Sequence, residues 1–312
     1  VANAWMQYPV GCEFNPDTMR NEMVSFFDVA LSPFAVSKFC HTVTSAWIIG
    51  AVFCVGVCCW YLMKKRETRL AVESLKIGAA VGLVATLLAA ATGHKSGQDV
   101  AEVQPMKLAA MEALYNGGVD QGLTAIALVN PFAQPDYANE AEAPLKIDMP
   151  YALSIMATND PHGFVPGVND LLNGYTRPDG TQEPSADEKI EMGKKAIASL
   201  AAYRKAKKAG DEETAAAELE VLNANMKYFG YGYIRDKSEL VPFIPVNFWA
   251  FRIMVGAGCL FILFFAVVLA VTYKWPKKLF AKYDITTLPA WHYWLAIALI
   301  PLAYIASESG WL

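Results

Sequence analysis

The sequence has few charged side chains and no excess of positive charge. Only 18% of the 312 residues are charged and 54% are hydrophobic, whereas a soluble domain has roughly 25% charged residues. The 26 Lys and Arg and 30 Asp and Glu leave a net charge of -4, so no broad basic surface is available for nucleic acid. The composition therefore favours a membrane protein and excludes nucleic acid as a partner.

The sequence also lacks the cysteine spacing of a disulfide framework or a zinc site. It has 6 cysteines but no pair of CxxC motifs, and most of them lie in or beside apolar runs. Cysteine in such runs behaves as a small hydrophobic residue. We therefore expect neither a disulfide nor a zinc ion. The cysteines are Cys12, Cys40, Cys54, Cys58, Cys59 and Cys259.

Four long stretches carry almost no charge. They cover residues 39–63, 77–93, 253–273 and 285–307, and a helix of about 20 residues crosses the apolar core of a bilayer. All four are continuously apolar, without the alternation of a membrane β-barrel strand. The sequence therefore predicts an all-α integral membrane protein, a transmembrane helix bundle with a long, mostly helical outer-side loop domain.

The short connections between these spans are basic, and their charge predicts how the spans are oriented in the membrane. By the positive-inside rule both connections face the cytoplasm, and the long segment 94–246 lies on the outer side. With no initiator Met and no signal peptide, we expect an internal fragment that opens on the tail of a preceding span. The expected parts are 1–93 with two spans, 94–246 as the outer domain, and 247–312 with two spans. The basic residues are Lys64, Lys65, Arg66 and Arg69, then Lys274, Lys277, Lys278 and Lys282.

The outer segment has helical and irregular portions. Residues 99–115 have helical character broken by Pro105, and residues 116–180 indicate loops with a short helix near 150–157. Ser185 and Glu188 form a capping box that opens a helix, and Gly210 separates it from a second helix. We expect these two helices to form an antiparallel pair.

Polar side chains within the spans are candidates for function because burying them in a bilayer is costly. His41 lies a few residues inside the outer start of the first span, and Met254 lies at a similar depth in the third. A His and a Met opposed in this way are the axial ligands of a low-spin haem used in electron transfer. Alternatively, His41 is a hydrogen-bonded structural residue and Met254 a packing residue.

Two further charged groups lie at the outer ends of spans. Arg252 could pair with haem propionates, or could simply extend its charge to water. Glu308 could ligate a high-spin iron or relay protons, or could be a helix-end carboxylate that reaches water.

In the outer segment, Lys107 and Glu112 have the chemistry that a quinol needs, a hydrogen-bond donor and a base. Five residues apart on a straight helix, they point roughly 140° apart, so one face cannot hold both. The alternative is that both belong to a solvated face. We assign no chemistry to His94, His162 or His292.

The segment 97–113, GQDVAEVQPMKLAAMEA, resembles the quinol-loop motif of subunit I of the cytochrome bd-type quinol oxidases. Further blocks are similar in order and spacing across essentially the whole chain. These blocks are 5–11, 14–15, 38–43, 150–153 and 251–255. The length of the loop and its helical second half resemble the long-loop branch of that family.

The resemblance implies roles for individual residues. It implies that His41 and Met254 are the axial ligands of low-spin haem b, with Arg252 beside that haem. It also implies that Lys107 and Glu112 act in quinol binding and oxidation. Glu308 is implied to serve the iron of high-spin haem b, next to haem d.

The implied activity is oxidation of quinol at the outer face, electron transfer through low-spin haem b to high-spin haem b and haem d, and reduction of O2 to water. This activity generates proton-motive force in the bacterial inner membrane, with 94–246 in the periplasm. The implied partners are oxidase subunit II, a small accessory membrane subunit, quinol, O2 and the lipid bilayer. The sequence departs from the family where His94 and Lys95 replace expected acidic residues, and the family's amino-terminal spans are missing.

Without the family resemblance, the residues are also compatible with two other functions. One is a haem-b membrane electron carrier without oxygen chemistry. The other is a haem-free transporter or receptor that relays protons through Glu308, which the absence of an inverted repeat disfavours.

Overall fold

The computed structural model describes residues 2–130, 132 and 145–311. These residues form two compact units. The membrane unit comprises residues 33–96 and 249–312, and the loop unit comprises residues 2–32 and 97–248. Residues 2–32 thus belong to the same compact unit as 97–248.

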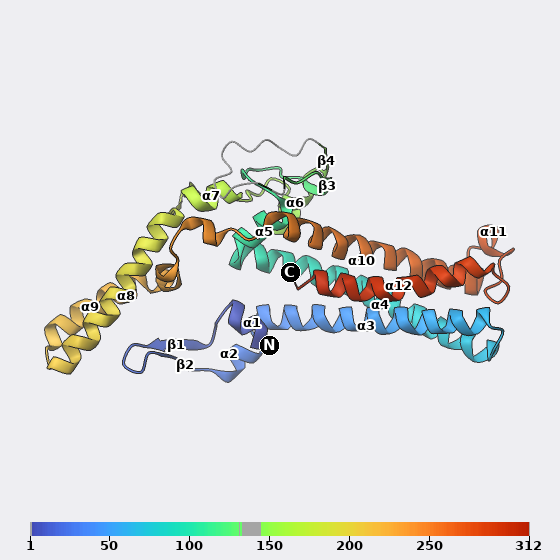
Figure 1. Cartoon of the computed structure of the whole chain (residues 1–312), viewed down its shortest axis with the longest axis horizontal. Helices are drawn as coiled ribbons and strands as arrows, with labels where there is room; N and C mark the ends of the chain where they lie inside the picture. The colour runs from blue at the N-terminus through green and yellow to red at the C-terminus, as the bar shows by residue number, and fades with distance from the viewer. Residues whose placement is uncertain (1, 131, 133–144, 312) are drawn as a thin grey trace. The chain divides into compact units, whose positions relative to one another are not determined.

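Four long apolar helices form the membrane unit, as the sequence predicts (Figure 1). They are α3 (Pro33–Met63), α4 (Thr68–Val103), α10 (Ile244–Tyr273) and α12 (Ala290–Ser309), with the short α11 (Lys277–Phe280) in between. Helices α4 and α10 also continue into the loop unit. The last span begins at Ala290 rather than at residue 285, because Pro289 occupies its N-cap and the Asp284 side chain holds a turn by accepting from the Thr286 backbone N–H at 2.9 Å.

Small residues let these helices approach one another closely. A Cβ atom on Gly78 would lie 3.0 Å from the Cys54 sulfur, and one on Gly82 would collide with the Phe265 ring. A Cβ atom on Gly56 would lie 2.7 Å from the Ile300 side chain. Because apolar side chains gain little by leaving lipid for protein, close van der Waals packing of this kind is what holds membrane helices together.

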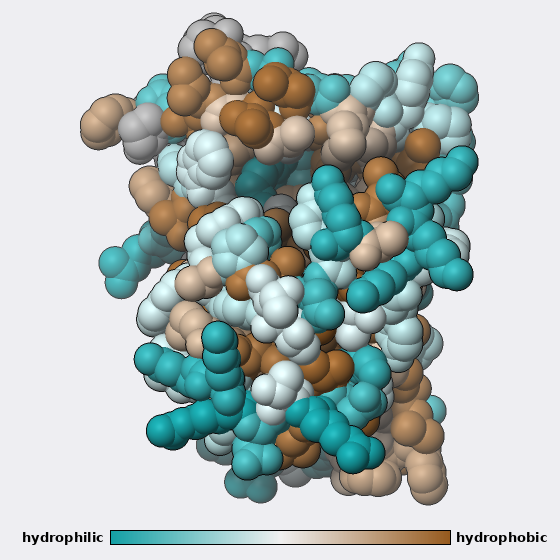
Figure 2. Space-filling model, turned by 90° about the vertical axis from the view of Figure 1, so that its right-hand side faces the viewer, coloured by the Kyte–Doolittle hydropathy of each residue, from teal (hydrophilic) through white to brown (hydrophobic). Residues whose placement is uncertain are grey.

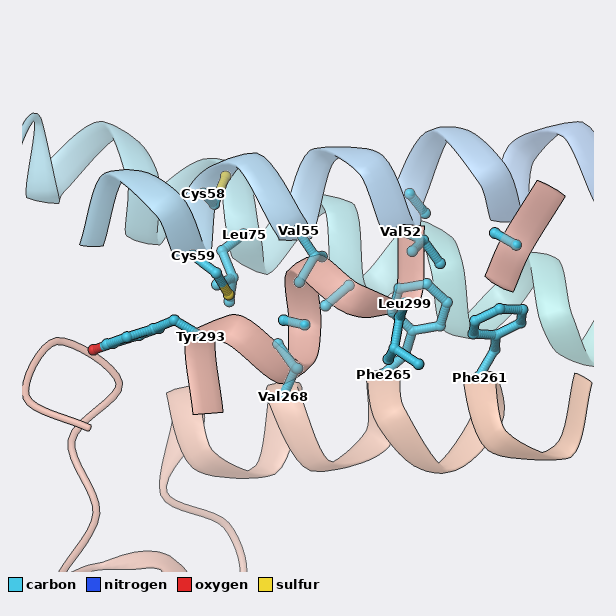
Figure 3. Close-up of a cluster of buried hydrophobic side chains, with 14 of the residues drawn as sticks. Val52, Val55, Cys58, Cys59, Leu75, Phe261, Phe265, Val268, Tyr293 and Leu299 are labelled. Atoms are coloured by element: carbon cyan, nitrogen blue, oxygen red, sulfur yellow. The ribbon is translucent and has the colours of Figure 1, made fainter. Parts of the chain in front are cut away.

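The apolar core of the membrane unit lies between these helices (Figure 3). Val52, Val55, Leu75 and Phe265 are fully buried in it. The ring of Tyr293 is also buried, and its hydroxyl donates a hydrogen bond of 2.7 Å to the Ile285 carbonyl. The core therefore fixes the helices in register along their length.

The basic connections lie at one end of the membrane unit. Figure 2 shows this end, with long hydrophilic side chains in teal standing out from it. The basic residues that orient the chain are exposed here, as the positive-inside rule requires of side chains in contact with water and lipid headgroups. They are Lys64, Lys65, Arg66, Arg69, Lys274, Lys277, Lys278 and Lys282.

Among its described residues, the loop unit combines helices with three antiparallel hairpins that the apolar pattern of the sequence does not predict. The hairpins pair β1 with β2, β3 with β4, and β5 with β6. The helices are α1 (Ala2–Gln7), α2 (Phe26–Ala30), α5 (Pro105–Glu112), α6 (Ala152–Thr158), α7 (Val168–Asn173), α8 (Ala186–Ala209), α9 (Glu212–Asn225), and the 3-10 helices η1 (Met226–Tyr233) and η2 (Lys237–Leu240). The strands are β1 (Cys12–Asn15), β2 (Arg20–Met23), β3 (Leu123–Ala127), β4 (Lys146–Met149), β5 (Tyr175–Thr176) and β6 (Gln182–Glu183).

The helical pair predicted in the outer segment is confirmed as α8 and α9. Ser185 and Glu188 form both hydrogen bonds of the capping box. Gly210 ends α8 with a φ of 76°, a left-handed conformation that glycine adopts without steric cost. The break at Pro105 is confirmed too, because α4 ends at Val103 and α5 begins at Pro105.

A charged contact joins the β1–β2 hairpin to α8. The Asp17 carboxylate accepts hydrogen bonds from the Tyr203 hydroxyl at 2.8 Å and from the Lys207 amine at 3.0 Å. These bonds hold the pKa of Asp17 below its ordinary value of 3.8, and together with the Tyr203 hydroxyl they raise the pKa of Lys207. The two segments are about 190 residues apart in sequence, and this contact helps to explain why residues 2–32 belong to the loop unit.

We expect Asp17→Asn to loosen this junction. The lowered pKa of Asp17 means that the contact stabilises the fold above the ordinary carboxyl pKa and is lost as the pH falls through the lowered value. The raised pKa of Lys207 means that the contact stabilises the fold below the ordinary lysine pKa and is lost as the pH rises through the raised value. Amide hydrogen exchange at neutral pH should therefore be faster in β1, β2 and the last turns of α8 in the variant.

The matched control is Glu191→Gln, which removes a 2.8 Å ion pair to Lys194 that lies within α8 itself. Exchange in the β1–β2 hairpin should not respond to this control. Equal exchange in the hairpin for Asp17→Asn and the parent would show that the contact does not hold the two segments together.

Candidate functional site

His41 lies in α3 near the end opposite the basic connections, with its ring against α4. The ring Nδ1 is 3.1 Å from the Thr92 hydroxyl oxygen. That hydroxyl lies 2.9 Å from the Leu88 carbonyl and 3.3 Å from the Ala89 carbonyl, so it can give its own hydrogen to either carbonyl and accept a hydrogen bond from the ring. In the tautomer with the proton on Nδ1, Nε2 would be the nitrogen that binds a metal, and ligating histidines typically donate their other ring N–H to a neighbouring acceptor.

Met254 lies at the same level of the membrane unit as His41. Phe265 of α10 packs on Gly82 of α4, and these helices are antiparallel. Met254 is eleven residues before Phe265, and Gly93 is eleven residues after Gly82, a distance of about 16 Å along either helix. Met254 is thus level with Gly93, and a Cβ atom on Gly93 would lie 3.3 Å from the His41 ring.

The donor set of this level fits a haem. An imidazole nitrogen and a thioether sulfur are the axial pair of a low-spin, electron-transferring haem. A Cβ atom on Gly310 would lie 3.0 Å from the Met254 sulfur. Each candidate ligand therefore has a glycine beside it, at a place where a larger residue would crowd the side chain.

Two charged residues accompany these ligands in the membrane unit. Arg252 is half-buried, and its guanidinium carbon lies 5.4 Å from the centroid of the Phe251 ring. A cation there could meet an anionic propionate. Glu308 lies in the last turn of α12, and its side chain is exposed. Its role as a ligand of high-spin haem b stays a prediction.

Lys107 and Glu112 both lie on α5, within the loop unit. Glu112 is the last residue of the helix and is 3% exposed, whereas Lys107 is half-buried. Burial lowers the pKa of Lys107. Because α5 is a regular helix, the two side chains leave it in different directions, as the sequence analysis expected. The pair offers a cationic donor and a carboxylate removed from bulk water.

The apolar face of α5 anchors it in the loop unit. Leu108, Ala109 and Ala110 are buried. The two alanines pack in one cluster with Val168 of α7, and Leu108 packs in another with Val100 at the end of α4. The backbone that carries Lys107 and Glu112 is therefore held on both sides.

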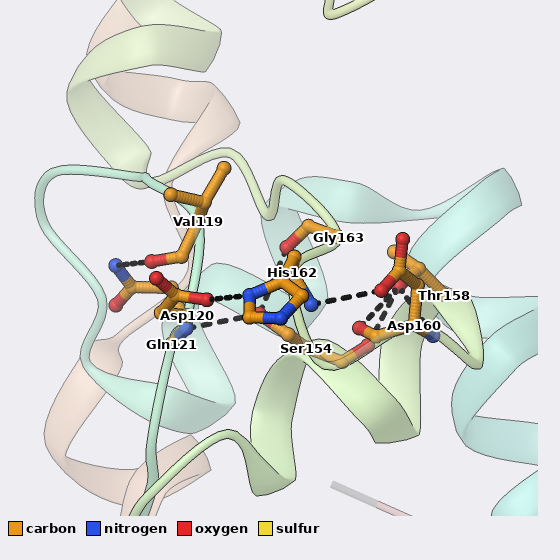
Figure 4. A network of polar contacts seen from close by, with 8 residues as sticks. All are labelled: Val119, Asp120, Gln121, Ser154, Thr158, Asp160, His162 and Gly163. Atoms are coloured by element: carbon orange, nitrogen blue, oxygen red, sulfur yellow. Dashed lines mark hydrogen bonds and ion pairs between the residues drawn. The ribbon is translucent and has the colours of Figure 1, made fainter.

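The structure adds a polar cluster around His162, to which the sequence analysis assigned no chemistry (Figure 4). The His162 Nδ1 lies 2.5 Å from an Asp120 carboxylate oxygen. The Ser154 hydroxyl bridges the backbone N–H of Gln121 and the Gly163 carbonyl at 2.9 Å and 2.8 Å. Both members of the His162–Asp120 pair are largely exposed, and exposed pairs contribute little to stability. His162 and Asp120 are 42 positions apart, so no local sequence pattern indicates that they pair.

The comparison with known proteins covers the whole chain. The sequence profile of the family described as cytochrome bd terminal oxidase subunit I matches residues 1–312. The chain is 33% identical to cytochrome bd-II ubiquinol oxidase subunit 1 of Escherichia coli (strain K12), over 99% of this chain and 57% of that protein. It is 30% identical to cytochrome bd ubiquinol oxidase subunit 1 of Bacillus subtilis (strain 168), over 100% of this chain and 51% of that protein.

A solved structure agrees in fold. The bd oxidase from Geobacillus thermodenitrificans matches with a TM-score of 0.65 and 21% identity, over 99% of this chain and 52% of that chain. The chain thus spans about half the length of the relatives it matches. From the profile match and the curated relatives, the chain belongs to the cytochrome bd terminal oxidase subunit I family.

Proposed function

We propose that this chain carries the low-spin haem site and the quinol-oxidising loop of a respiratory quinol:oxygen oxidoreductase. Family membership implies a haem cofactor and a membrane protein. The observation that carries the proposal is the contact of the His41 Nδ1 with the Thr92 hydroxyl, at the level where Met254 lies, because a ring held through Nδ1 would bind a metal through Nε2. The family and this donor pair together favour an oxidoreductase over a haem-free transporter.

The membrane unit would hold haem through four residues, three at low-spin haem b and one at high-spin haem b. His41 and Met254 would bind the iron of low-spin haem b, and Arg252 would pair with a propionate or favour the reduced state through its positive charge. When bound, the haem supplies one-electron oxidation and reduction. Glu308 would bind the iron of high-spin haem b.

The loop unit would bind and deprotonate quinol. The Lys107 amine would donate a hydrogen bond to a quinol oxygen, and the Glu112 carboxylate would accept the proton of a quinol hydroxyl as the electrons leave. The Glu112 side chain is buried, so the proton would pass to a carboxylate removed from bulk water.

The basic connections favour an orientation in the bacterial inner membrane with 94–246 in the periplasm. Protons from quinol would then be released outside, and O2 would be reduced to water with protons drawn from the cytoplasm, which generates proton-motive force. Oxygen chemistry would need the remaining length of the protein, oxidase subunit II and a small accessory membrane subunit. The family match does not favour a haem-b electron carrier without oxygen chemistry.

We expect His41→Ala and Met254→Ala to remove the low-spin haem b bands from the reduced-minus-oxidised spectrum of the full-length protein with its partner subunit. Each substitution deletes an axial ligand, while the bands of haem d should remain. His292→Ala and Met63→Ala are the controls, because both residues lie toward the end with the basic connections. Low-spin haem that survives both ligand substitutions would show that other residues hold it.

We expect Lys107→Met to lower kcat/KM for quinol by roughly 10- to 100-fold, the value of a hydrogen bond from a charged group. Burial lowers the pKa of Lys107, so its charge is lost at a lower pH than that of an exposed lysine. Activity should therefore fall at alkaline pH in the parent and persist there in Lys107→Arg. The control is Lys195→Met, at an exposed position of α8, and identical pH profiles for parent and Lys107→Arg would contradict this role.

We expect Glu112→Gln to lower kcat for quinol oxidation by roughly 100-fold or more, the usual effect of a general base. The amide keeps the shape of the buried side chain but cannot take the proton. Stopped-flow reduction of low-spin haem b by quinol would measure this step, with dithionite reduction of the same variant as the control. A normal rate with quinol would remove Glu112 from the reaction.

A further inference from the structure

We propose that Thr92 is a positioning residue that fixes the tautomer and rotation of the His41 ring and so sets the reduction potential of the low-spin haem. The proposal rests on the proposed function, because it takes His41 to be an axial ligand. It adds a residue of α4 to a site whose candidate ligands lie on α3 and α10.

The direction of the hydrogen bond follows from the partners of the Thr92 hydroxyl. This group has one hydrogen, and two carbonyls of its own helix lie within reach of it, Leu88 at 2.9 Å and Ala89 at 3.3 Å. Threonine in a helix commonly donates to the carbonyl one turn earlier. With its hydrogen used in this way, the hydroxyl offers its lone pairs to the ring nitrogen Nδ1 at 3.1 Å, which matches the Nδ1–H tautomer of His41.

The surroundings hold the ring at this hydroxyl. The Gly93 backbone leaves so little room that an added Cβ atom would lie 3.3 Å from the ring Cε1. One turn away, the Lys38 amine donates to the Ser96 hydroxyl at 2.9 Å, which ties α3 and α4 together beside the ring. The Ser45 hydroxyl donates to the His41 carbonyl at 2.8 Å, which adds a contact on the backbone side.

A hydrogen bond accepted from Nδ1–H makes the opposite nitrogen a stronger electron donor. A stronger donor favours the ferric state of an iron bound at Nε2, and hydrogen bonding around the ligands is one of the means by which proteins adjust haem potentials. The Thr92 hydroxyl therefore lowers the potential. A neutral hydroxyl acts less strongly than a carboxylate would, so the Met254 sulfur, which raises the potential, still has a large influence.

The test compares Thr92→Val with Thr92→Ser in the full-length protein with its partner subunit. Valine keeps the branched shape but cannot accept the hydrogen bond, whereas serine can. We expect Thr92→Val to keep the low-spin haem, to raise its midpoint potential in a spectroelectrochemical titration, and to shift its low-spin EPR signal. Thr92→Ser should match the parent in both measurements.

The matched control is Thr86→Val, also on α4, where a buried threonine hydroxyl donates to the Gly82 carbonyl one turn earlier. This variant loses the same kind of backbone bond without facing His41, and its potential should not change. Loss of general helix stability would affect both valine variants alike.

An unchanged potential in Thr92→Val with haem retained would overturn the proposal. If Thr92→Val does not assemble, Thr92→Ala and Thr92→Ser give the same comparison, with the higher potential expected in Thr92→Ala and equal potentials counting against the role. Low-spin haem that survives His41→Ala would contradict the proposed ligand instead. Failure of the ligand assignment and failure of the Thr92 role are therefore distinguishable.

Discussion

The close packing of four antiparallel helices is the constraint on which the rest of the candidate haem site depends. Glycines at the contacts let α4 meet α3 and α10 at short distance, and each contact fixes one register. Phe265 of α10 packs on Gly82 of α4. Because the two helices are antiparallel and rise equally per residue, Met254 is level with Gly93, which lies beside the His41 ring. The chemistry of the site thus follows from packing about 16 Å away along the helices.

This constraint also explains why the polar groups of the membrane unit are tolerable. A polar group in a bilayer needs an internal partner. The Thr92 hydroxyl bonds to its own helix and to the His41 ring, and the Lys38 amine bonds to Ser96. In the loop unit, by contrast, water can solvate exposed polar groups such as His162 and Asp120.

The sequence predicts the parts of the structure that depend on local pattern. Uninterrupted apolar runs identify the four spans, Pro105 marks the break between α4 and α5, and the Ser185 capping box marks the start of α8. The three hairpins were missed because their strands have two to five residues, too few for a periodic signal. The start of α12 was placed too early because hydropathy does not detect the turn at Asp284.

The candidate site also combines features that the sequence predicts with features that only the structure shows. His41 and Met254 stand out in the sequence as polar or ligating groups at similar depth in apolar runs, and the structure adds the register that puts them at one level. The partnership of Thr92 with His41 could not be predicted, because it joins residues 51 positions apart and threonine is unremarkable in a helix. The roles of Lys107 and Glu112 came from the resemblance of segment 97–113, since their spacing alone favours a solvated face.

The central claim is that one haem iron is bound by His41 and Met254. Near-infrared magnetic circular dichroism of the oxidised full-length protein with its partner subunit tests this most directly, because the ligand-to-iron charge-transfer band differs between axial ligand pairs. The account predicts the signature of histidine–methionine ligation, lost when Met254 is replaced by alanine. A bis-histidine signature, or a histidine–methionine band that persists in Met254→Ala, would contradict it.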